Sequence, residues 1–188
     1  MHSEKDLVHR AQKRDPEAFG ELYEAHFDRV YRYMLLRVRN RADAEDLTQQ
    51  VFLKALEHIG SYRYRGMPFA AWLFRIAHNQ VVDHWKKKSH DKSRMVPLDQ
   101  VDEARIMAND DPALLTEQRA DIEMVAAACQ MLSDGQREVI SLRFGGGLSV
   151  AETARAMRKS EGAVKVLQHA ALVRLRRIVC PQREAEND

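Results

Sequence analysis

The sequence predicts an all-α fold with two helical domains, and two kinds of observation support this prediction. Apolar residues recur at three- and four-residue steps through most of the chain, which is the period of a helix with one buried face. Helix-start signals, such as Asp-Pro and Ser-x-x-Glu/Gln, stand before several of these stretches. We expect one domain over residues 1–90, an acidic flexible linker over residues 91–111, and a second domain over residues 112–188 that contains a helix-turn-helix.

Charge is distributed unevenly along the 188 residues. Residues 1–95 hold 18 Lys/Arg against 13 Asp/Glu, residues 96–138 hold 3 against 10, and residues 139–188 hold 9 against 5. Two basic blocks separated by an acidic one suggest two modules that bind polyanions, joined by a linker that avoids nucleic acid or imitates it. The net charge of +2 hides this pattern.

The sequence argues against several kinds of site and location. The sequence shows no signal peptide and no apolar run long enough to span a membrane, so we expect a cytoplasmic protein that does not bind membranes. Cys129 and Cys180 are isolated and are interpreted as reduced thiols. No metal-binding pattern and no nucleophile–base arrangement is present, so we expect no metal, no cofactor and no enzymatic activity.

The first domain is predicted to begin with two helices. Ser3 is a suitable N-cap for a helix over residues 3–14. Asp15 and Pro16 then provide the N-cap and first-turn proline of a long helix that runs to about Arg39. Asn40 is expected to cap the C-terminus of that helix.

A third helix, DAEDLTQQVFLKALEHI, is expected to begin at Asp43 and to end at Gly60. Its spacing predicts a buried side of Leu47, Val51, Phe52, Ala55, Leu56 and Ile59. The outer side carries acids, amides and one leucine: Glu45, Asp46, Gln49, Gln50 and Leu53. From the residues alone, this outer side is either solvated surface or a binding surface.

The stretch PFAAWLFRIAHNQVVDHWKKK, residues 68–88, predicts the central helix. One stripe is apolar, and a second stripe carries an aromatic ring, polar groups and cations, namely Trp72, Arg75, Asn79, Asp83, Lys86 and Lys87. The loop before it alternates aromatic and guanidinium groups: Tyr62, Arg63, Tyr64 and Arg65. Stacking surfaces beside cations suit single-stranded nucleic acid. In the alternative interpretation, Trp72 belongs to the core and the charges are solvated.

In the second domain, Ser133/Gln136 and Ser149/Glu152 have the spacing of capping boxes. A helix over residues 150–157, a tight turn and a second helix over residues 161–178 have the proportions of a helix-turn-helix. The expected duplex contacts of this motif are Ser149, Ser160, Glu161, Lys165, Gln168, His169 and Arg174. Arg174 is equally compatible with solvated surface.

Taken together, these segments resemble the bacterial extracytoplasmic-function (ECF) sigma factors, which are specificity subunits of RNA polymerase. The segments AFGELYEAHFDRVYRYMLLRV, DAEDLTQQVFLKAL, FAAWLFRIAHNQVVDHWKK, LSDGQREVISLRF and LSVAETARAM occur in the order of that family. The second helix of the helix-turn-helix departs from the family pattern at Ala163, Val166, Leu167 and Ala170.

The resemblance implies a partner for each surface. The outer side of the third helix, with Asp43, Glu45, Asp46, Gln49 and Gln50, would bind the clamp of core RNA polymerase. The loop and central helix would hold the single strand of the start-proximal promoter element. The second domain would dock on the polymerase flap and read the upstream element as duplex. The acidic linker would thread the channel used by nascent RNA, and an anti-sigma factor is a further partner.

One rival interpretation is a helix-turn-helix transcription regulator that is not a polymerase subunit. The tyrosine–arginine loop and the aromatic central helix count against this alternative, because a protein that reads only duplex DNA has little use for stacking surfaces.

Overall fold

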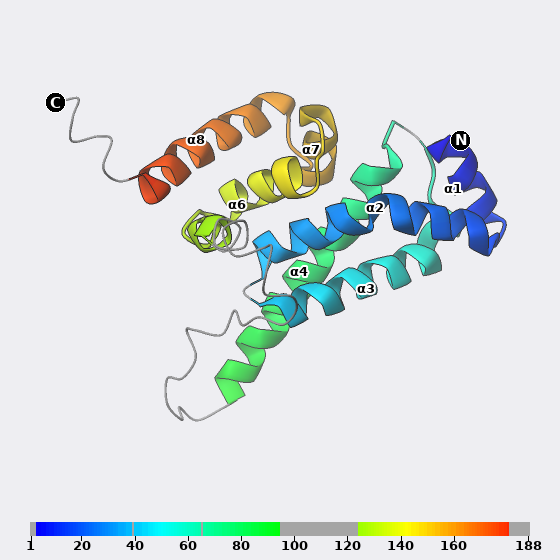
Figure 1. Cartoon of the computed structure of the whole chain (residues 1–188), viewed down its shortest axis with the longest axis horizontal. Helices are drawn as coiled ribbons and strands as arrows, with labels where there is room; N and C mark the ends of the chain where they lie inside the picture. Colours follow the sequence, from blue (N-terminus) through cyan, green and yellow to red (C-terminus); the bar gives the residue numbers. More distant parts are fainter. Residues whose placement is uncertain (1–2, 39, 65, 95–123, 181–188) are drawn as a thin grey trace, which may run out of the picture.

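The computed structural model describes residues 3–38, 40–64, 66–94 and 124–180, and for residues 91–94 only the backbone (Figure 1). Over these residues the chain forms helices and connecting turns, with no strand. The all-α prediction is therefore confirmed. The predicted linker, apart from its first four residues, lies outside the described residues.

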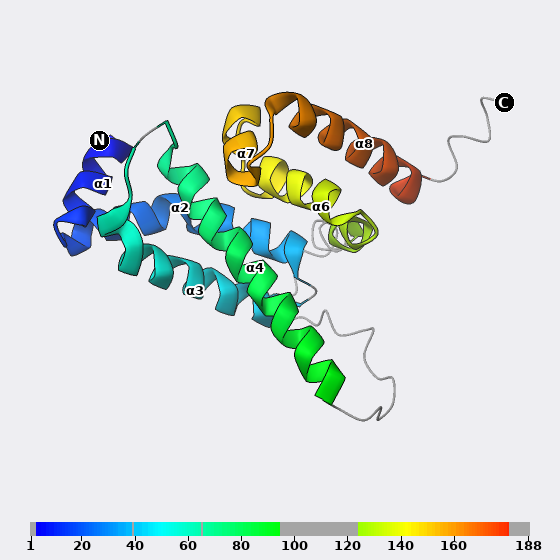
Figure 2. The same ribbon diagram turned by 180° about the vertical axis from the view of Figure 1, so that it is seen from behind.

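The N-terminal half is a helical bundle. It consists of α1 (Glu4–Gln12), α2 (Pro16–Arg37), α3 (Arg41–His58), the 3₁₀ turn η1 (Ile59–Ser61) and α4 (Phe69–Arg94). Figures 1 and 2 show α2, α3 and α4 packed side by side, with α1 at one end of the bundle. Ser3 and Asp15 cap α1 and α2 as predicted, because their side chains accept hydrogen bonds from first-turn backbone N–H groups.

The bundle encloses a core of aliphatic and aromatic side chains from these helices. The largest fully buried members come from α2, α3 and α4: Leu22, Val30, Tyr33, Met34, Val51, Leu73, Phe74 and Val81. Val51 lies on the buried side that the sequence predicts for the third helix.

The C-terminal half contains residues 124–130, which are helical, followed by α6 (Asp134–Ile140), the π turn η2 (Ser141–Gly145), α7 (Val150–Met157) and α8 (Glu161–Val179). Ser149 and Glu152 form the predicted capping box, with the Ser149 N–H donating to the Glu152 carboxylate at 2.8 Å. Ala154 of α7 and Val164 of α8 share one buried cluster. The helix-turn-helix is confirmed.

The two halves pack directly against each other, with α6 and α7 over α2 and α4 (Figures 1 and 2). Leu142 and Leu148 of the C-terminal half belong to the same buried cluster as the N-terminal core. Gly146 lies so close to Phe74 that an added Cβ would come within 2.7 Å of its ring. Arg29 Nε donates to the Gly146 carbonyl at 2.7 Å.

Three local predictions are wrong. Asn40 is the N-cap of α3 and does not cap α2, since its side chain accepts from the Asp43 N–H at 2.6 Å. Helix α4 continues to Arg94, beyond the predicted end at Lys88, because straight-chain polar residues sustain a helix without an apolar stripe. Leu56 is 51% exposed, although the spacing places it on the buried side.

The corrected role of Asn40 predicts a stability change. Asn40→Ala removes the acceptor for the Asp43 N–H, so it should lower the free energy of unfolding by about 1 kcal/mol. Asn40→Asp keeps a capping oxygen and should retain most of the stability. Urea unfolding followed by circular dichroism measures both variants, and equal stability of Asn40→Ala and the parent would contradict the cap assignment.

Candidate nucleic-acid and polymerase interfaces

The polar stripe of α4 lies partly at the surface. Asn79, Asp83, Lys86 and Lys87 are exposed, whereas Trp72 and Arg75 are half-buried. Trp72 packs against the core, with its ring centroid 5.1 Å from that of Tyr62 and 5.5 Å from that of Phe69. The half-buried Trp72 therefore agrees in part with both interpretations of the sequence, because it packs against the core and is still partly accessible.

The loop before α4 divides its aromatic residues between core and surface. Tyr62 is only 5% exposed, and its hydroxyl donates to the Met67 carbonyl at 2.7 Å. Burial, followed by the nearby Glu4 and Tyr64, raises the pKa of Tyr62 to about 12. The ring of Tyr62 is therefore packed in the core in this structure, and the stacking role expected for it stays a prediction.

Tyr64 remains as the accessible ring of this loop, since it is 62% exposed. Arg63 is also exposed, and its guanidinium donates to the carbonyls of Gly60 and Tyr62, each at 3.0 Å. These bonds fix the guanidinium of Arg63 on the loop backbone, one residue before Tyr64. Arg65 lies outside the described residues.

The outer side of α3 presents a mixed polar and apolar surface. Asp46, Gln49 and Gln50 are exposed as predicted, and beside them Leu53 is 58% exposed. The sequence analysis missed Leu56, which is also exposed. Helical spacing alone could not find it, because Leu56 stands at the border between the two sides.

Two acids at the start of α3 already have partners within the chain. Glu45 accepts from Arg41 Nε at 2.9 Å, and Asp43 lies 2.6 Å from Lys88 Nζ. Burial raises the pKa of Asp43, but Lys88 and other hydrogen-bonding neighbours outweigh it, so the net shift is downward. Asp43 therefore links α3 to α4 through an ion pair, and its carboxylate is not an unpaired surface acid.

The start of α8 carries the predicted duplex-facing residues. Glu161, Lys165, His169 and Arg174 are exposed, whereas Gln168 is half-buried and accepts from Arg143 Nε at 2.9 Å. The Ser149 and Ser160 hydroxyls accept from backbone N–H groups as N-caps, each at 3.2 Å. The apolar Leu167 packs against the C-terminal core.

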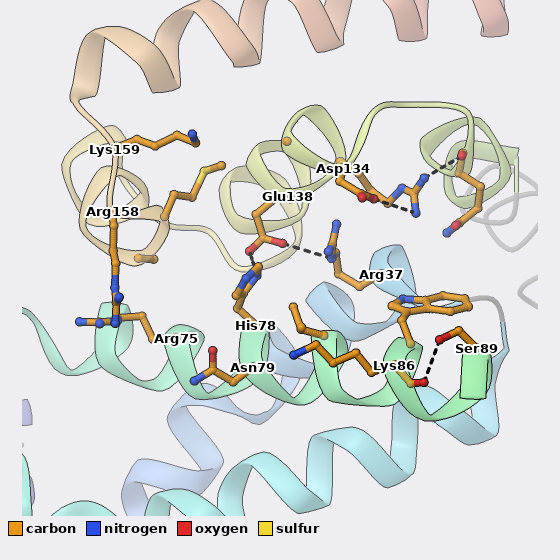
Figure 3. A pocket seen from close by; sticks show the side chains of 17 residues that line it. Arg37, Arg75, His78, Asn79, Lys86, Ser89, Asp134, Glu138, Arg158 and Lys159 are labelled. Carbon is orange, nitrogen blue, oxygen red and sulfur yellow. Dashed lines mark hydrogen bonds and ion pairs between the residues drawn. The ribbon is translucent and has the colours of Figure 1, made fainter. Parts of the chain in front are cut away.

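Between the two halves lies a cavity of about 910 Å³, shown in Figure 3. Arg75, Asn79 and Lys86 of α4 line one side of it. Arg158 and Lys159, from the turn between α7 and α8, line the opposite side. These two cations were not predicted from the sequence, since only the tertiary packing brings the turn opposite α4.

Within residues 3–38, 40–64, 66–94 and 124–180, no group of His, Cys, Asp or Glu has an arrangement that could hold a metal ion. None of the described helices is both long enough and apolar enough to cross a membrane. Cys129 is buried and Cys180 is exposed, and both are free thiols.

Comparison with known proteins places both halves in one family. Sigma-70 region 2 matches residues 22–90, and Sigma-70, region 4 matches residues 129–177. The ECF RNA polymerase sigma factor BldN of Streptomyces coelicolor is 42% identical over 93% of this chain, which spans 65% of the length of BldN. ShbA of Streptomyces griseus, also an ECF RNA polymerase sigma factor, is 35% identical over 90% of this chain and 92% of its own.

Solved structures support the fold. The structure of CnrH in complex with the cytosolic domain of CnrY matches with a TM-score of 0.71 at 23% identity, covering 96% of this chain and 99% of that one. The sigma factor RpoE in complex with the anti-sigma factor NepR from Bartonella quintana matches with a TM-score of 0.66 at 22% identity, covering 86% of this chain and 96% of that one.

The two matched regions and the helix-turn-helix define the class of protein as sigma-70-type initiation factors, which bind core RNA polymerase and direct it to promoters. The chain belongs to the ECF family of RNA polymerase sigma factors.

The contrast between Tyr62 and Tyr64 predicts that one is structural and the other is not. Tyr62→Ala removes a buried ring and should lower the free energy of unfolding by about 3 kcal/mol. Tyr64→Ala removes an exposed ring and should change it by less than about 0.5 kcal/mol. Thermal and urea unfolding of both variants would measure this difference, and a stable Tyr62→Ala would show that its ring is dispensable to the core.

Proposed function

We propose that this sigma factor binds core RNA polymerase, directs it to specific promoters and helps to open the start-proximal element. The observation that supports this most strongly is the presence of both sigma-70 regions in one chain, over residues 22–90 and 129–177. The protein would act in the cytoplasm by binding and strand separation, without catalysing a reaction.

The outer side of α3 is the proposed surface for the polymerase clamp. Asp46, Gln49 and Gln50 supply exposed polar groups, while Leu53 adds apolar area beside them. Apolar contact with a small number of polar groups suits a protein interface better than it suits DNA. The C-terminal half would bind the flap, and an anti-sigma partner stays a prediction of the family resemblance.

The DNA-binding work is divided between two surfaces. Tyr64, Arg63 and the exposed part of the α4 stripe would hold the unpaired strand, because an accessible ring beside cations suits unstacked bases. Lys165 and His169, near the start of α8, would read the upstream element as duplex. The proposed role of the acidic linker in the RNA channel concerns residues outside those described.

The rival interpretation as a regulator that is not a polymerase subunit loses its support. A regulator of that kind needs the helix-turn-helix but has no need for sigma-70 region 2, which matches residues 22–90.

The proposed clamp surface can be tested by reversing one charge. Asp46→Arg should reduce co-purification with core polymerase by at least tenfold, because it places a cation in an interface that accommodates an acid. Circular dichroism should show unchanged helix content, since Asp46 is exposed.

Glu24→Arg is a matched control, because Glu24 is an exposed acid on α2 outside the proposed surface. It should leave polymerase binding near that of the parent. If Asp46→Arg binds core polymerase as well as this control does, the assignment of the α3 surface is wrong.

The division of labour between the two DNA surfaces predicts opposite responses to a template that is already unpaired. Tyr64→Ala holoenzyme should bind a duplex promoter but open it poorly, since each stacked base contributes about 1–3 kcal/mol. A template mismatched over the start-proximal element should restore part of its activity. Lys165→Ala should weaken duplex binding by about 1–3 kcal/mol, and the mismatched template should help it little.

Permanganate reactivity of thymines and run-off transcription on both templates would measure these effects. Glu24→Arg again provides the control for nonspecific damage. Equal rescue of Tyr64→Ala and Lys165→Ala by the mismatched template would contradict separate roles.

A further inference from the structure

A carboxylate of the C-terminal half is buried among three polar side chains of the N-terminal half. Glu138 of α6 is only 5% exposed. The Tyr33 hydroxyl donates to Glu138 Oε1 at 2.9 Å, and Arg37 Nε lies 3.2 Å from Oε2. His78 Nδ1 of α4 lies 3.1 Å from Oε1 (Figure 3). We call these four residues the Glu138 cluster.

The cluster favours a single docking arrangement of the two halves. Buried charges need a partner in a defined position, since a charge that loses its partner while still buried is strongly destabilising. Burial raises the pKa of Glu138, but His78, Arg37 and Tyr33 outweigh it, and the net pKa is lowered. The carboxylate therefore stays charged at neutral pH and can attract the Arg37 guanidinium.

Such a contact is also reversible. If the halves separate, water can solvate the carboxylate and its three partners. Exposing these polar groups therefore costs less free energy than exposing apolar groups would. Leu142 and Leu148 add apolar contact to the interface, and Arg29 adds its bond to the Gly146 carbonyl. These contacts favour the docked state.

A repulsion acts against them on the other side of the cavity. Arg75 of α4 and Arg158 of the α7–α8 turn approach each other there (Figure 3). Burial, followed by the charge of Arg158, lowers the pKa of Arg75. Among the described residues, no acid has an ion pair with either guanidinium. Docking is therefore a balance between an attractive cluster and two facing cations.

We propose that the Glu138 cluster is a latch that holds the free protein in a closed state, and that the latch opens when the protein joins core polymerase. In the closed state, Arg75, Asn79 and Lys86 face the C-terminal half across the cavity. The halves are in contact, whereas the clamp, the flap and the two promoter elements are separate targets. The effect of the latch on polymerase binding, which we call gating, rests on the proposed function. The existence of the latch in the free protein does not.

Closure lowers the apparent affinity for core polymerase. When only the open fraction can bind, the apparent Kd equals the intrinsic Kd divided by that fraction. A variant with a larger open fraction should therefore have a lower apparent Kd. A variant with a smaller open fraction should have a higher one. This relation links a measurement on the free protein to one on the complex.

Closure can be measured by energy transfer between two dyes on the full chain. Cys180 is an exposed thiol, and Lys5→Cys adds a second one on the exposed side of α1. Cys129 is buried, and burial raises its pKa, so it should react slowly with the dyes. The parent protein should show a narrow distribution of transfer efficiencies, as expected for one docked arrangement.

Two variants should open the latch. Glu138→Gln keeps the size of the side chain but removes its charge, so the closed-to-open ratio should fall roughly tenfold or more. His78→Ala removes a partner of Glu138 on α4 and leaves the sequence of α6 unchanged. This variant therefore controls for misfolding of the C-terminal half. Circular dichroism should show near-parental helix content for both.

A matched pair of variants at Arg158 tests whether the closed fraction can also be increased. Arg158→Glu places an acid opposite Arg75 and should increase the closed fraction, whereas Arg158→Gln only removes the repulsion and should have a smaller effect. Apparent Kd values for core polymerase should fall for Glu138→Gln and His78→Ala. They should rise for Arg158→Glu, with Arg158→Gln between it and the parent.

The outcomes separate the latch from the proposed function. Identical transfer distributions for the parent, Glu138→Gln and His78→Ala would overturn the latch. Altered distributions with unchanged Kd values would overturn the gating. If the parent itself fails to bind core polymerase, the proposed function is wrong, while the dye measurements still decide whether the latch exists.

Discussion

The buried carboxylate of Glu138 is the constraint on which the arrangement of the two halves depends. It stands near the end of α6 and contacts side chains from α2 and α4, which lie far from it in the sequence. Because Tyr33 and Arg37 are themselves buried, their polar atoms need this acceptor wherever water is excluded. The docking of the helix-turn-helix half on the bundle is thus specified by polar groups as well as by Leu142 and Leu148.

Helix α4 combines a side that is buried in the bundle with a side that borders the cavity. Leu73, Phe74 and Val81 are buried in the bundle, while Asn79 and Lys86 border the cavity. Its basic C-terminal part is also fixed to α3, since Asp43 lies 2.6 Å from Lys88 Nζ and 3.3 Å from His84 Nε2. A rigid element holds its functional side chains more precisely than a loop does. The position of the α4 stripe is therefore set by the core behind it.

Local signals in the sequence predicted the features that depend on near neighbours. Asp15 and the pair Ser149/Glu152 act as caps because their partners are within four residues. Leu56 was placed wrongly and the burial of Tyr62 was not predicted, because the exposure of both depends on packing between distant segments, which periodicity does not contain. The same limit applies to Glu138, whose partners Tyr33, Arg37 and His78 lie far from it in the sequence.

Tyr62 and Tyr64, two residues apart, have opposite environments, since the first is buried and the second is exposed. The ring of Tyr62 fills the core against Phe69 and Trp72, and this fixes the backbone of the loop. Tyr64 is exposed two residues later, and the guanidinium of Arg63 between them donates to the carbonyls of Gly60 and Tyr62. If Tyr64 and Arg63 bind the unpaired strand as proposed, a loop that is already ordered loses less conformational entropy on binding. The buried Tyr62 thus supports the loop that carries the exposed Tyr64, and the two tyrosines of the sequence alternation have different environments.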